Sequence, residues 1–170
     1  TLLTSHLATT TFLVVDLETT GFIPGRDEIV EIAAVVVNAI GEPKVALNSI
    51  IKPRRRIAGT DIHGLTEADV ADAPHISELE EPLRALMANR VIAAHNSAFD
   101  VQFLQEALGD YSREPPFPHV CTMGLNTMLG LGAQYPLSYA CGYFGIEIGT
   151  QHTALDDAVA TARLLQHHIR

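Results

Sequence analysis

Three segments rich in β-branched and other apolar residues near the start of the chain limit the folds that it can adopt. Residues 12–15 predict a short buried strand, residues 29–37 a second and residues 45–51 a third. Turns that contain glycine and proline separate them at 21–25 and 38–43. Because strands joined by short connections pair in antiparallel fashion, we expect the fold to begin with three antiparallel strands.

The rest of the chain alternates between helical and extended patterns. Apolar residues at helical spacing predict a helix at 74–88, a second that is capped by Ser97 and ends near Leu108, and a last one from about Thr153. Shorter elements are also expected: strands at 91–94 and near His119, and helices around Met123 and at 137–144. This order predicts an α/β fold with a mixed five-stranded sheet flanked by helices, in one domain that spans residues 1–170.

The charge of the chain limits how it can bind nucleic acid. The net charge is −9, whereas a protein that grips duplex DNA through many phosphates is usually basic. This acidity suits a protein that binds cations, or one that reaches phosphate through metal ions. The dense positive run of Lys52, Arg54, Arg55 and Arg56 is usually a solvated loop, but it is also the best candidate for steering a nucleic-acid backbone.

Cysteine usage and hydropathy indicate a cytoplasmic protein. Cys121 and Cys141 lie twenty residues apart, which excludes a zinc knuckle and a disulfide framework and leaves two small core residues. No apolar run is long enough to cross a membrane, and residues 1–10 lack the pattern of a signal peptide. The sequence starts at Thr1 and stops at Arg170, directly after a helical pattern, as expected of a piece of a longer protein.

Asp16 and Glu18 form a D-x-E pair just past the first predicted strand. Residues two apart in an extended chain point to one face, where two carboxylates repel each other unless a cation lies between them. Hard cations such as Mg²⁺ or Mn²⁺ prefer such oxygen ligands. A nucleotide hydrolase would also need a lysine in a glycine-rich loop, and neither Lys44 nor Lys52 follows one. Taken alone, the pair more often marks a solvated strand end.

Two further motifs place polar residues where a helix begins. His95 and Asn96 precede Asp100 in the pattern H-N-x-x-F-D, directly after a predicted strand. His152 precedes Asp157 in the pattern H-x-x-x-x-D, which opens the last predicted helix. In isolation, an acid in a first helical turn is explained by the helix dipole, and His95 and Asn96 are explained as polar residues that fix the turn.

Together and in this order, the three motifs resemble the DnaQ-like (DEDDh) 3′→5′ exonucleases, the family of the exonuclease domain of the DNA polymerase III epsilon subunit. The resemblance covers about residues 12–168. It includes Thr19, Thr20 and Gly21 directly after the acidic pair, and residues 62–66 in the loop at mid-chain. It implies a ribonuclease-H-like fold and an enzyme that hydrolyses phosphodiester bonds.

The same resemblance implies hydrolysis of single-stranded nucleic acid to nucleoside monophosphates, with DNA preferred, in proofreading or DNA repair. It also implies two divalent cations, Mg²⁺ or Mn²⁺, and a histidine as general base. Carried over by position, the metal ligands are Asp16, Glu18, Asp100 and Asp157, and the general base is His152. Asp156 competes with Asp157 because helical periodicity barely separates the two. The family's spacing of five residues from the histidine selects Asp157.

The chemistry explains why these residue types would occur together. Phosphodiester hydrolysis needs an attacking hydroxide, relief of charge in the transition state and a stabilised leaving oxygen, which two metal ions roughly 3.5–4 Å apart supply. Asp16 is placed to bridge both ions because its strand is expected at the centre of the sheet. A histidine titrates near neutral pH and can take the proton of the water. Gly149, in the loop before His152, would let that side chain swing in.

Substrate contacts are expected around the same motifs. The predicted substrate-binding residues are Thr19, Thr20, Gly21, Phe22, His63, His95 and Asn96. Phe22 or Phe99 is placed to stack on a base, although core packing is the preferred interpretation of Phe99. His167 and His168 lie in the last helical turn, where the helix dipole favours a cation.

Alternative functions share the fold or part of the motifs. One is an RNA-trimming exoribonuclease, and another is a non-catalytic module that binds nucleic acid or a polymerase. A third is a different phosphohydrolase that acts on nucleotides. The full set of acids and the histidine favours an active enzyme. The low positive charge predicts weak, distributive binding of single-stranded DNA or RNA 3′ ends unless a partner, such as a DNA polymerase subunit, adds affinity.

Overall fold

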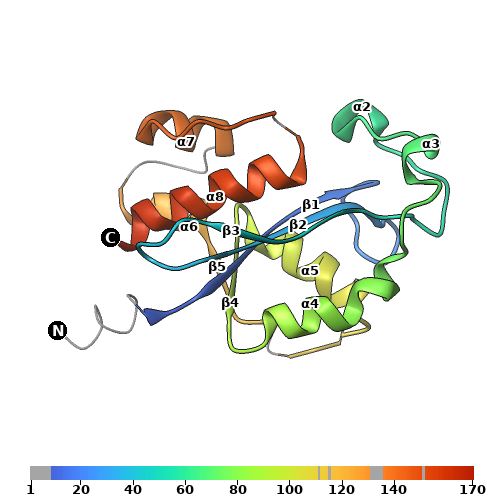
Figure 1. The fold of residues 1–170 in the computed structure, drawn as a ribbon, viewed down its shortest axis with the longest axis horizontal. Coiled ribbons are helices and arrows are strands. Elements are labelled where there is room, and N and C mark those ends of the chain that lie inside the picture. Colours follow the sequence, from blue (N-terminus) through green and yellow to red (C-terminus); the bar gives the residue numbers. More distant parts are fainter. Residues whose placement is uncertain (1–8, 111, 115, 131–135, 151) are drawn as a thin grey trace.

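The computed structural model describes residues 9–110, 112–114, 116–130, 136–150 and 152–170, which form one sheet with helices on both faces (Figure 1). The strands are β1 (Phe12–Thr19), β2 (Ile29–Val37), β3 (Lys44–Ile50), β4 (Val91–Ala94) and β5 (His119–Cys121). Their order in the sheet is β3-β2-β1-β4-β5, so β1 is the central strand. β1 to β3 pair in antiparallel fashion, whereas β4 and β5 are parallel to β1. The predicted mixed five-stranded sheet is confirmed.

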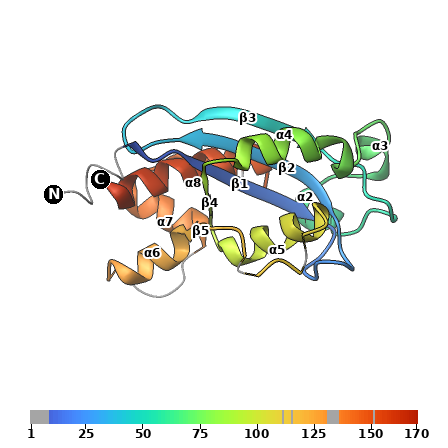
Figure 2. The same ribbon diagram turned by 90° about the horizontal axis from the view of Figure 1, so that it is seen from below.

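Helices cover the two faces unequally. The described helices are α2 (Thr60–His63), α3 (Glu67–Val70), the 3₁₀ turn η1 (Ile76–Leu79), α4 (Glu80–Met87), α5 (Ser97–Ala107), α6 (Thr122–Met128), α7 (Leu137–Phe144) and α8 (Ala154–Ile169). Figure 1 shows α4 and α5 below the sheet and the long α8 above it. Figure 2 shows α6 and α7 gathered on the side of the C-terminal half of α8.

Side chains that alternate along β1 build two separate cores. Leu13, Val15 and Leu17 pack with residues of α4 and α5 on one face. Phe12 and Val14 pack on the other face with the small residues of α8. Because alternate residues of a strand share a face, Asp16 and Glu18 continue the row that faces α8. The pattern that builds the cores therefore decides which helix the acidic pair meets.

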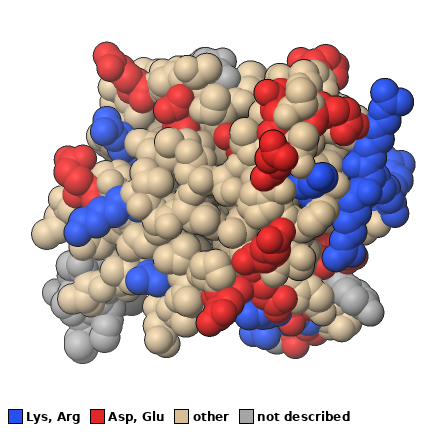
Figure 3. Space-filling view, turned by 45° about the vertical axis from the view of Figure 1, so that its right-hand side comes forward, with Lys and Arg blue, Asp and Glu red and all other residues tan. Residues whose placement is uncertain are grey.

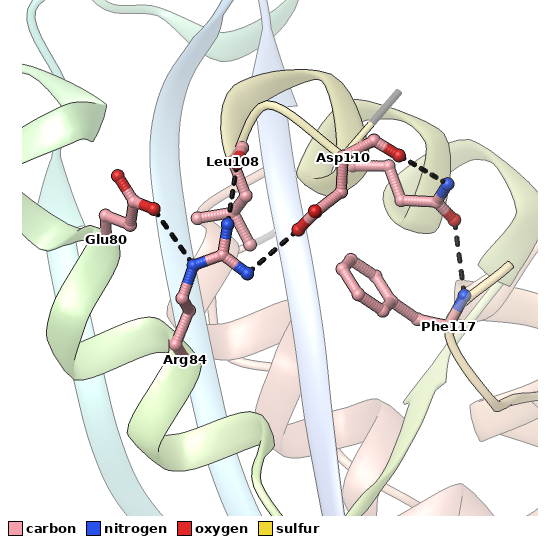
Figure 4. A network of polar contacts seen from close by, with 6 residues as sticks. Glu80, Arg84, Leu108, Asp110 and Phe117 are labelled. Carbon is pink, nitrogen blue, oxygen red and sulfur yellow. Dashed lines mark hydrogen bonds and ion pairs between the residues drawn. The ribbon is translucent and has the colours of Figure 1, made fainter. Parts of the chain in front are cut away.

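One arginine ties the two helices of the lower face together. Arg84 of α4 forms ion pairs with Glu80 at 2.9 Å and with Asp110 at 2.8 Å, and it donates to the carbonyl oxygen of Leu108 at 2.7 Å (Figure 4). Asp110 follows α5, and its carbonyl oxygen accepts from the side chain of Gln105. These contacts fix the end of α5, so its start, which carries Asp100, is held from the far end as well.

Several predicted boundaries need correction. β1 runs on to Thr19, so the acidic pair lies inside the strand and not just past it. The expected helix at 74–88 is a 3₁₀ turn followed by α4. Pro82 explains this break, because a proline is tolerated in the first turn of a helix but not in its interior. The helices α2 and α3, in a segment that was expected to be a loop, were not predicted.

The cap of α5 also differs from expectation. Asn96, and not Ser97, is the N-cap, and no side chain caps this helix. Asn96 has a φ of 73°, which asparagine tolerates better than most residues. Only His95 and Asn96 connect β4 to α5. At the start of α8, by contrast, Thr153 caps the helix, with its side chain accepting from the N–H of Asp156; the predicted start of the helix near Thr153 is confirmed.

Two simpler expectations concern cysteine and membranes. Both cysteines are free thiols, with Cys141 buried and Cys121 only half-buried at the start of α6. Core packing is therefore right for Cys141 but incomplete for Cys121. In the described part of the chain, no helix has the length and apolar character needed to span a bilayer.

Candidate active site

The acidic pair lies on the part of β1 that extends beyond β4. The last paired residues of the two strands are Val14 and Ala93, so Asp16 and Glu18 stand past the carboxyl end of β4. Ligand sites in α/β sheets gather at such ends. On the other side of β1, Glu18 is paired with Glu31 of β2, and the register shifts directly after it. The carboxylates thus lie where β1 is still paired with β2 but no longer with β4.

The start of α5 brings Asp100 to the same place. Asp100 is buried in the first turn of the helix. Its carboxylate accepts hydrogen bonds from its own main-chain N–H and from that of Leu17, between the two acids of β1. The carboxylate is thereby held against the central strand.

The start of α8 adds a third acid and the histidine. Ala154 and Ala158 pack in the core between α8 and the sheet, which places the first turn of α8 over β1. Ligand atoms of Glu18, His152 and Asp157 lie within 4.8 Å of one another. His152 is exposed, has a φ of 64° and directly precedes the capping residue of α8. Its main-chain N–H donates to the carboxylate of Asp157.

The two neighbouring acids of α8 have different surroundings. The carboxylate of Asp156 accepts from the N–H of Thr150 at 2.7 Å and from the hydroxyl of Thr153 at 3.1 Å. A Cβ at Gly149 would lie only 2.7 Å from the carboxyl carbon of Asp156, so the loop needs glycine there. Asp156 therefore folds the loop that carries His152, whereas Asp157 faces β1. Sequence periodicity alone did not separate the two.

The carboxylates strongly perturb one another. Burial raises the pKa of Asp16 well above its usual range, and the negative charges of Asp100, Asp157, Glu18 and Glu31 raise it further. Burial, followed by Glu31 and Asp157, raises the pKa of Glu18 from 4.5 to about 7. The pKa values of Asp100 and Asp157 are also raised, chiefly by burial. So many close carboxylates are costly unless cations offset their repulsion, and their oxygens suit Mg²⁺ or Mn²⁺.

Glu31 is a site residue that the sequence motifs missed. It is half-buried opposite Glu18, and its carboxylate accepts from the N–H of Ala154, the first residue of α8, at 3.3 Å. Its pKa is raised, chiefly by burial. One signal was available: Glu31 is the one charged residue in the nine-residue strand IVEIAAVVV. A charge inside an apolar strand needs a partner, which here is the end of a helix.

The turn after Glu18 is fixed by its own polar groups. The hydroxyl of Thr19 donates to the carbonyl oxygen of Gly21 at 2.6 Å, and that of Thr20 accepts from the N–H of Glu28 at 3.0 Å. A Cβ at Gly21 would lie 2.5 Å from the carboxyl group of Asp27, so a side chain at this position would displace that carboxyl group. Because the hydroxyl groups of Thr19 and Thr20 are hydrogen-bonded within the turn, the contacts with a substrate that are expected of these residues would come from their main-chain groups.

Two phenylalanines flank this turn in different ways. Phe22 is 74% exposed, and its ring lies 6.5 Å from that of Phe99. Phe99 packs on Phe103 at 4.8 Å and against the core, as the preferred interpretation of this residue predicts. An exposed aromatic ring beside an acidic site is therefore supplied by Phe22.

The remaining predicted substrate residues hold loops. His63 is buried, with Nε2 bonded to the carbonyl oxygen of Ala58 at 2.8 Å and Nδ1 accepting from the N–H of Leu65 at 3.1 Å. The ring of His95 forms a hydrogen bond with the hydroxyl of Thr122 at 2.8 Å. These contacts show what the rings do in the fold, and direct contact with a substrate stays a prediction.

The sequence itself matches the RNase T exonuclease family over residues 13–165. The chain belongs to this exonuclease family. The family predicted from the three acidic motifs is thereby confirmed. Membership in the exonuclease family implies that divalent metal ions take part in catalysis, in agreement with the oxygen-rich cluster at the end of β1.

Longer proteins contain a similar exonuclease segment. A DNA polymerase III subunit epsilon-like protein of Rhodobacter capsulatus is 38% identical over 159 residues, which are 89% of this chain and 23% of that protein. A PolC-type DNA polymerase III of Oceanobacillus iheyensis is 34% identical over 160 residues, 91% of this chain and 11% of the polymerase. The exonuclease chain thus spans less than a quarter of the length of these relatives.

Solved exonucleases share its fold. The structure of Exonuclease X in complex with 5′ overhanging duplex DNA has 30% sequence identity and a TM-score of 0.70, covering 92% of this chain and 90% of that one. Exonuclease I of E. coli with a dA16 oligonucleotide has 19% identity and a TM-score of 0.76, covering 93% and 40%. At that identity the likeness shows the fold alone. The ribonuclease-H-like fold expected for this exonuclease is confirmed.

Proposed function

We propose that the chain is a 3′→5′ exonuclease domain that hydrolyses the last phosphodiester bond of single-stranded nucleic acid, with DNA preferred over RNA. The products are nucleoside monophosphates. The observation that carries this proposal is the convergence of Glu18, His152 and Asp157 within 4.8 Å of one another, beside Asp16 and Asp100. These residues come from three separate segments of the chain, and the fold brings them to one edge of the sheet.

Two divalent cations, Mg²⁺ or Mn²⁺, are proposed as cofactors, with Asp16, Glu18, Asp100 and Asp157 as their ligands. When bound, such ions activate water and stabilise the leaving oxygen. The pKa values of all four carboxyl groups are raised, first by burial and then by the negative charges of neighbouring carboxylates. Bound cations would offset both effects, which supports this ligand set. Asp16 is central in the proposal, since it feels the charges of the other three.

His152 is proposed as the general base that takes the proton of the attacking water. Its ring is exposed and next to Glu18 and Asp157, so it can face a substrate bound above the carboxylates. The loop before it is shaped by Gly149 and Asp156. The general base is therefore held by the loop, while its ring stays accessible to the substrate.

The terminal nucleotide is proposed to lie against the turn at Thr19, Thr20 and Gly21. Main-chain groups of this turn would contact the sugar, and the exposed ring of Phe22 would stack on a base. Stacking on an aromatic ring tolerates every base, which suits an enzyme that removes nucleotides regardless of sequence. His63, His95 and Asn96 shape the surrounding loops in this proposal and contact the substrate at its edge.

Residues 1–170 are proposed to act as one exonuclease domain in DNA proofreading or repair, in the cytoplasm. The similarity to segments of DNA polymerase III proteins supports this setting. A polymerase subunit is proposed as a partner that supplies the affinity for DNA which the acidic chain itself lacks.

The deciding experiment uses single-stranded DNA and RNA, each labelled at the 3′ or the 5′ end, with Mg²⁺, Mn²⁺ or EDTA. Metal-dependent shortening from the 3′ end that disappears in Asp16→Ala would establish the reaction. Faster cleavage of RNA than of DNA would favour an exoribonuclease. Absence of cleavage by folded, metal-loaded protein would contradict the proposed activity and favour a non-catalytic binding module.

A further inference from the structure

Four arginines form a basic edge beside the turn that follows Glu18. Arg26 lies in the connection from β1 to β2, and Arg54, Arg55 and Arg56 lie between β3 and α2. All four are exposed, and we call them the arginine rim. Figure 3 shows Lys and Arg side chains gathered at the right-hand edge of the molecule, next to acidic and neutral surface.

The rim is anchored to the active site through Glu28. The carboxylate of Glu28 accepts from the main-chain N–H groups of Arg54 at 3.0 Å and Arg55 at 2.9 Å. The main chain of Glu28 in turn accepts from the N–H of Thr20 at 2.9 Å and donates to its hydroxyl at 3.0 Å. Thr20 is two residues beyond Glu18. The position of the rim relative to the carboxylates is therefore set by hydrogen bonds and not by the arginine side chains.

The guanidinium groups of the rim are exposed even where they are paired. Arg26 is paired with Asp27 at 3.2 Å, and its side chain is 65% exposed. Arg56 is paired with Glu67 at 3.7 Å, but its side chain is 91% exposed, and such surface pairs contribute little. Arg55 donates to the carbonyl oxygen of Arg26, so two members of the rim lie together. The ammonium group of Lys52, by contrast, donates a hydrogen bond to the carbonyl oxygen of Ala71. The predicted basic run thus divides into a structural lysine and three outward arginines.

We infer that the arginine rim binds the phosphates of the single strand a few nucleotides before its 3′ end and supplies most of the salt-dependent affinity of the domain. This inference rests on the proposed function of the carboxylate site. Guanidinium forks match phosphate oxygens in geometry and charge. With a net charge of −9, the rest of the surface repels a polyanion, so a strand that reaches the carboxylates is guided along the rim.

The binding test uses Arg54→Gln/Arg55→Gln/Arg56→Gln, which keeps the main-chain N–H groups that Glu28 accepts from. The matched control, Arg113→Gln/Arg163→Gln/Arg170→Gln, removes the same charge from exposed arginines outside the rim. Affinity for fluorescein-labelled oligothymidylate and oligouridylate is measured by anisotropy without divalent metal at several salt concentrations. For three lost phosphate contacts, the slope of log affinity against log salt should become shallower by about 2. The control should keep the wild-type slope.

A kinetic test separates strand binding from the chemistry. Hydrolysis of the oligonucleotide is compared with that of a small ester, p-nitrophenyl thymidine 5′-phosphate, which cannot reach the rim. The rim variant should lose at least roughly tenfold in kcat/KM for the oligonucleotide relative to the ester, through KM. Equal losses on both substrates, or equal slopes in the rim and control variants, would overturn the inference. Rim-dependent binding without any hydrolysis by the wild type would uphold it and refute the proposed function instead.

Discussion

Glu31 accepts a hydrogen bond from the main-chain N–H of Ala154 and thereby joins the start of β2 to the first turn of α8. His152 lies two residues before Ala154, and Asp157 lies within this first turn. A contact between a carboxylate and a helix N-terminus is favourable. The hydrogen bond of Glu31 therefore helps to fix the start of α8 over β1. The contact is distant in sequence but adjacent to the proposed general base.

Glu31 is therefore expected to position the end of α8. Glu31→Ala should lower kcat roughly tenfold or more, because small misplacements of catalytic groups are costly. Glu31→Gln keeps an acceptor oxygen and should restore most of that loss. Steady-state kinetics with a labelled oligonucleotide checks both. If Glu31→Gln is as damaged as Glu31→Ala, the charge of Glu31 matters and not its hydrogen bond.

Asp156 and Asp157 give a matched pair of variants. Asp157→Ala should abolish measurable hydrolysis and weaken Mn²⁺ binding by calorimetry, while the fold remains. Asp156→Ala should instead lose the loop contacts to Thr150 and Thr153. The expected cost is about 1 kcal/mol, or about 2–4 °C in melting temperature, with metal binding retained. The reverse pattern would reassign the ligand to Asp156.

Replacing the proposed general base isolates the proton transfer. His152→Ala should reduce kcat by roughly 10²–10⁴-fold while the melting temperature stays near that of the wild type, because the side chain is exposed. A variant that turns over at close to the normal rate would remove the role of His152.

Stability without metal should depend on pH in an unusual direction. The pKa of Glu18 is raised to about 7, so the folded state holds this proton more tightly than the unfolded state does. Such a group contributes stability that is fully present below its ordinary pKa and is lost as the pH rises through about 7. The raised pKa values of Asp16 and Asp100 act in the same sense.

In EDTA, the melting temperature should therefore fall by several degrees between about pH 5 and pH 8. His168, whose pKa is lowered by burial, opposes the fall below neutral pH, so His168→Gln should make the decline steeper. Adding Mn²⁺ should remove this fall in melting temperature, and Glu18→Gln should reduce it. A melting temperature that rises over this range in EDTA would contradict the prediction. Differential scanning fluorimetry at matched ionic strength is sufficient.

The sequence predicted the sheet and the family because those depend on local patterns. Apolar runs marked the strands, and short turns marked the antiparallel half. The spacing from His152 pointed to Asp157 only through family resemblance. What separates Asp157 from Asp156 is a loop contact of Asp156 with Thr150, and no periodicity within the helix encodes it.

Other features depend on contacts between distant segments. The sequence motifs did not identify Glu31 as a site residue, because its hydrogen-bond partner, Ala154, is 123 residues away along the chain. Asn96, and not Ser97, is the N-cap of α5, and its positive φ of 73° is a backbone feature that the pattern of residues 95–97 did not predict. Both ring nitrogens of His63 form hydrogen bonds within its own loop, which the sequence did not predict; its contact with a substrate stays a prediction.

The alternation of β1 has a consequence for how the domain can change in evolution. One row of side chains, Phe12 and Val14, continues directly into Asp16 and Glu18. Inserting or deleting one residue directly before Asp16 would break the continuity of this row. If the apolar residues before the change kept their faces, both carboxylates would turn toward α4 and α5; if the carboxylates kept theirs, the apolar residues before them would change face and disrupt the two cores. Diversification of this strand is therefore confined to substitutions, and length variation is pushed into the turns that flank it.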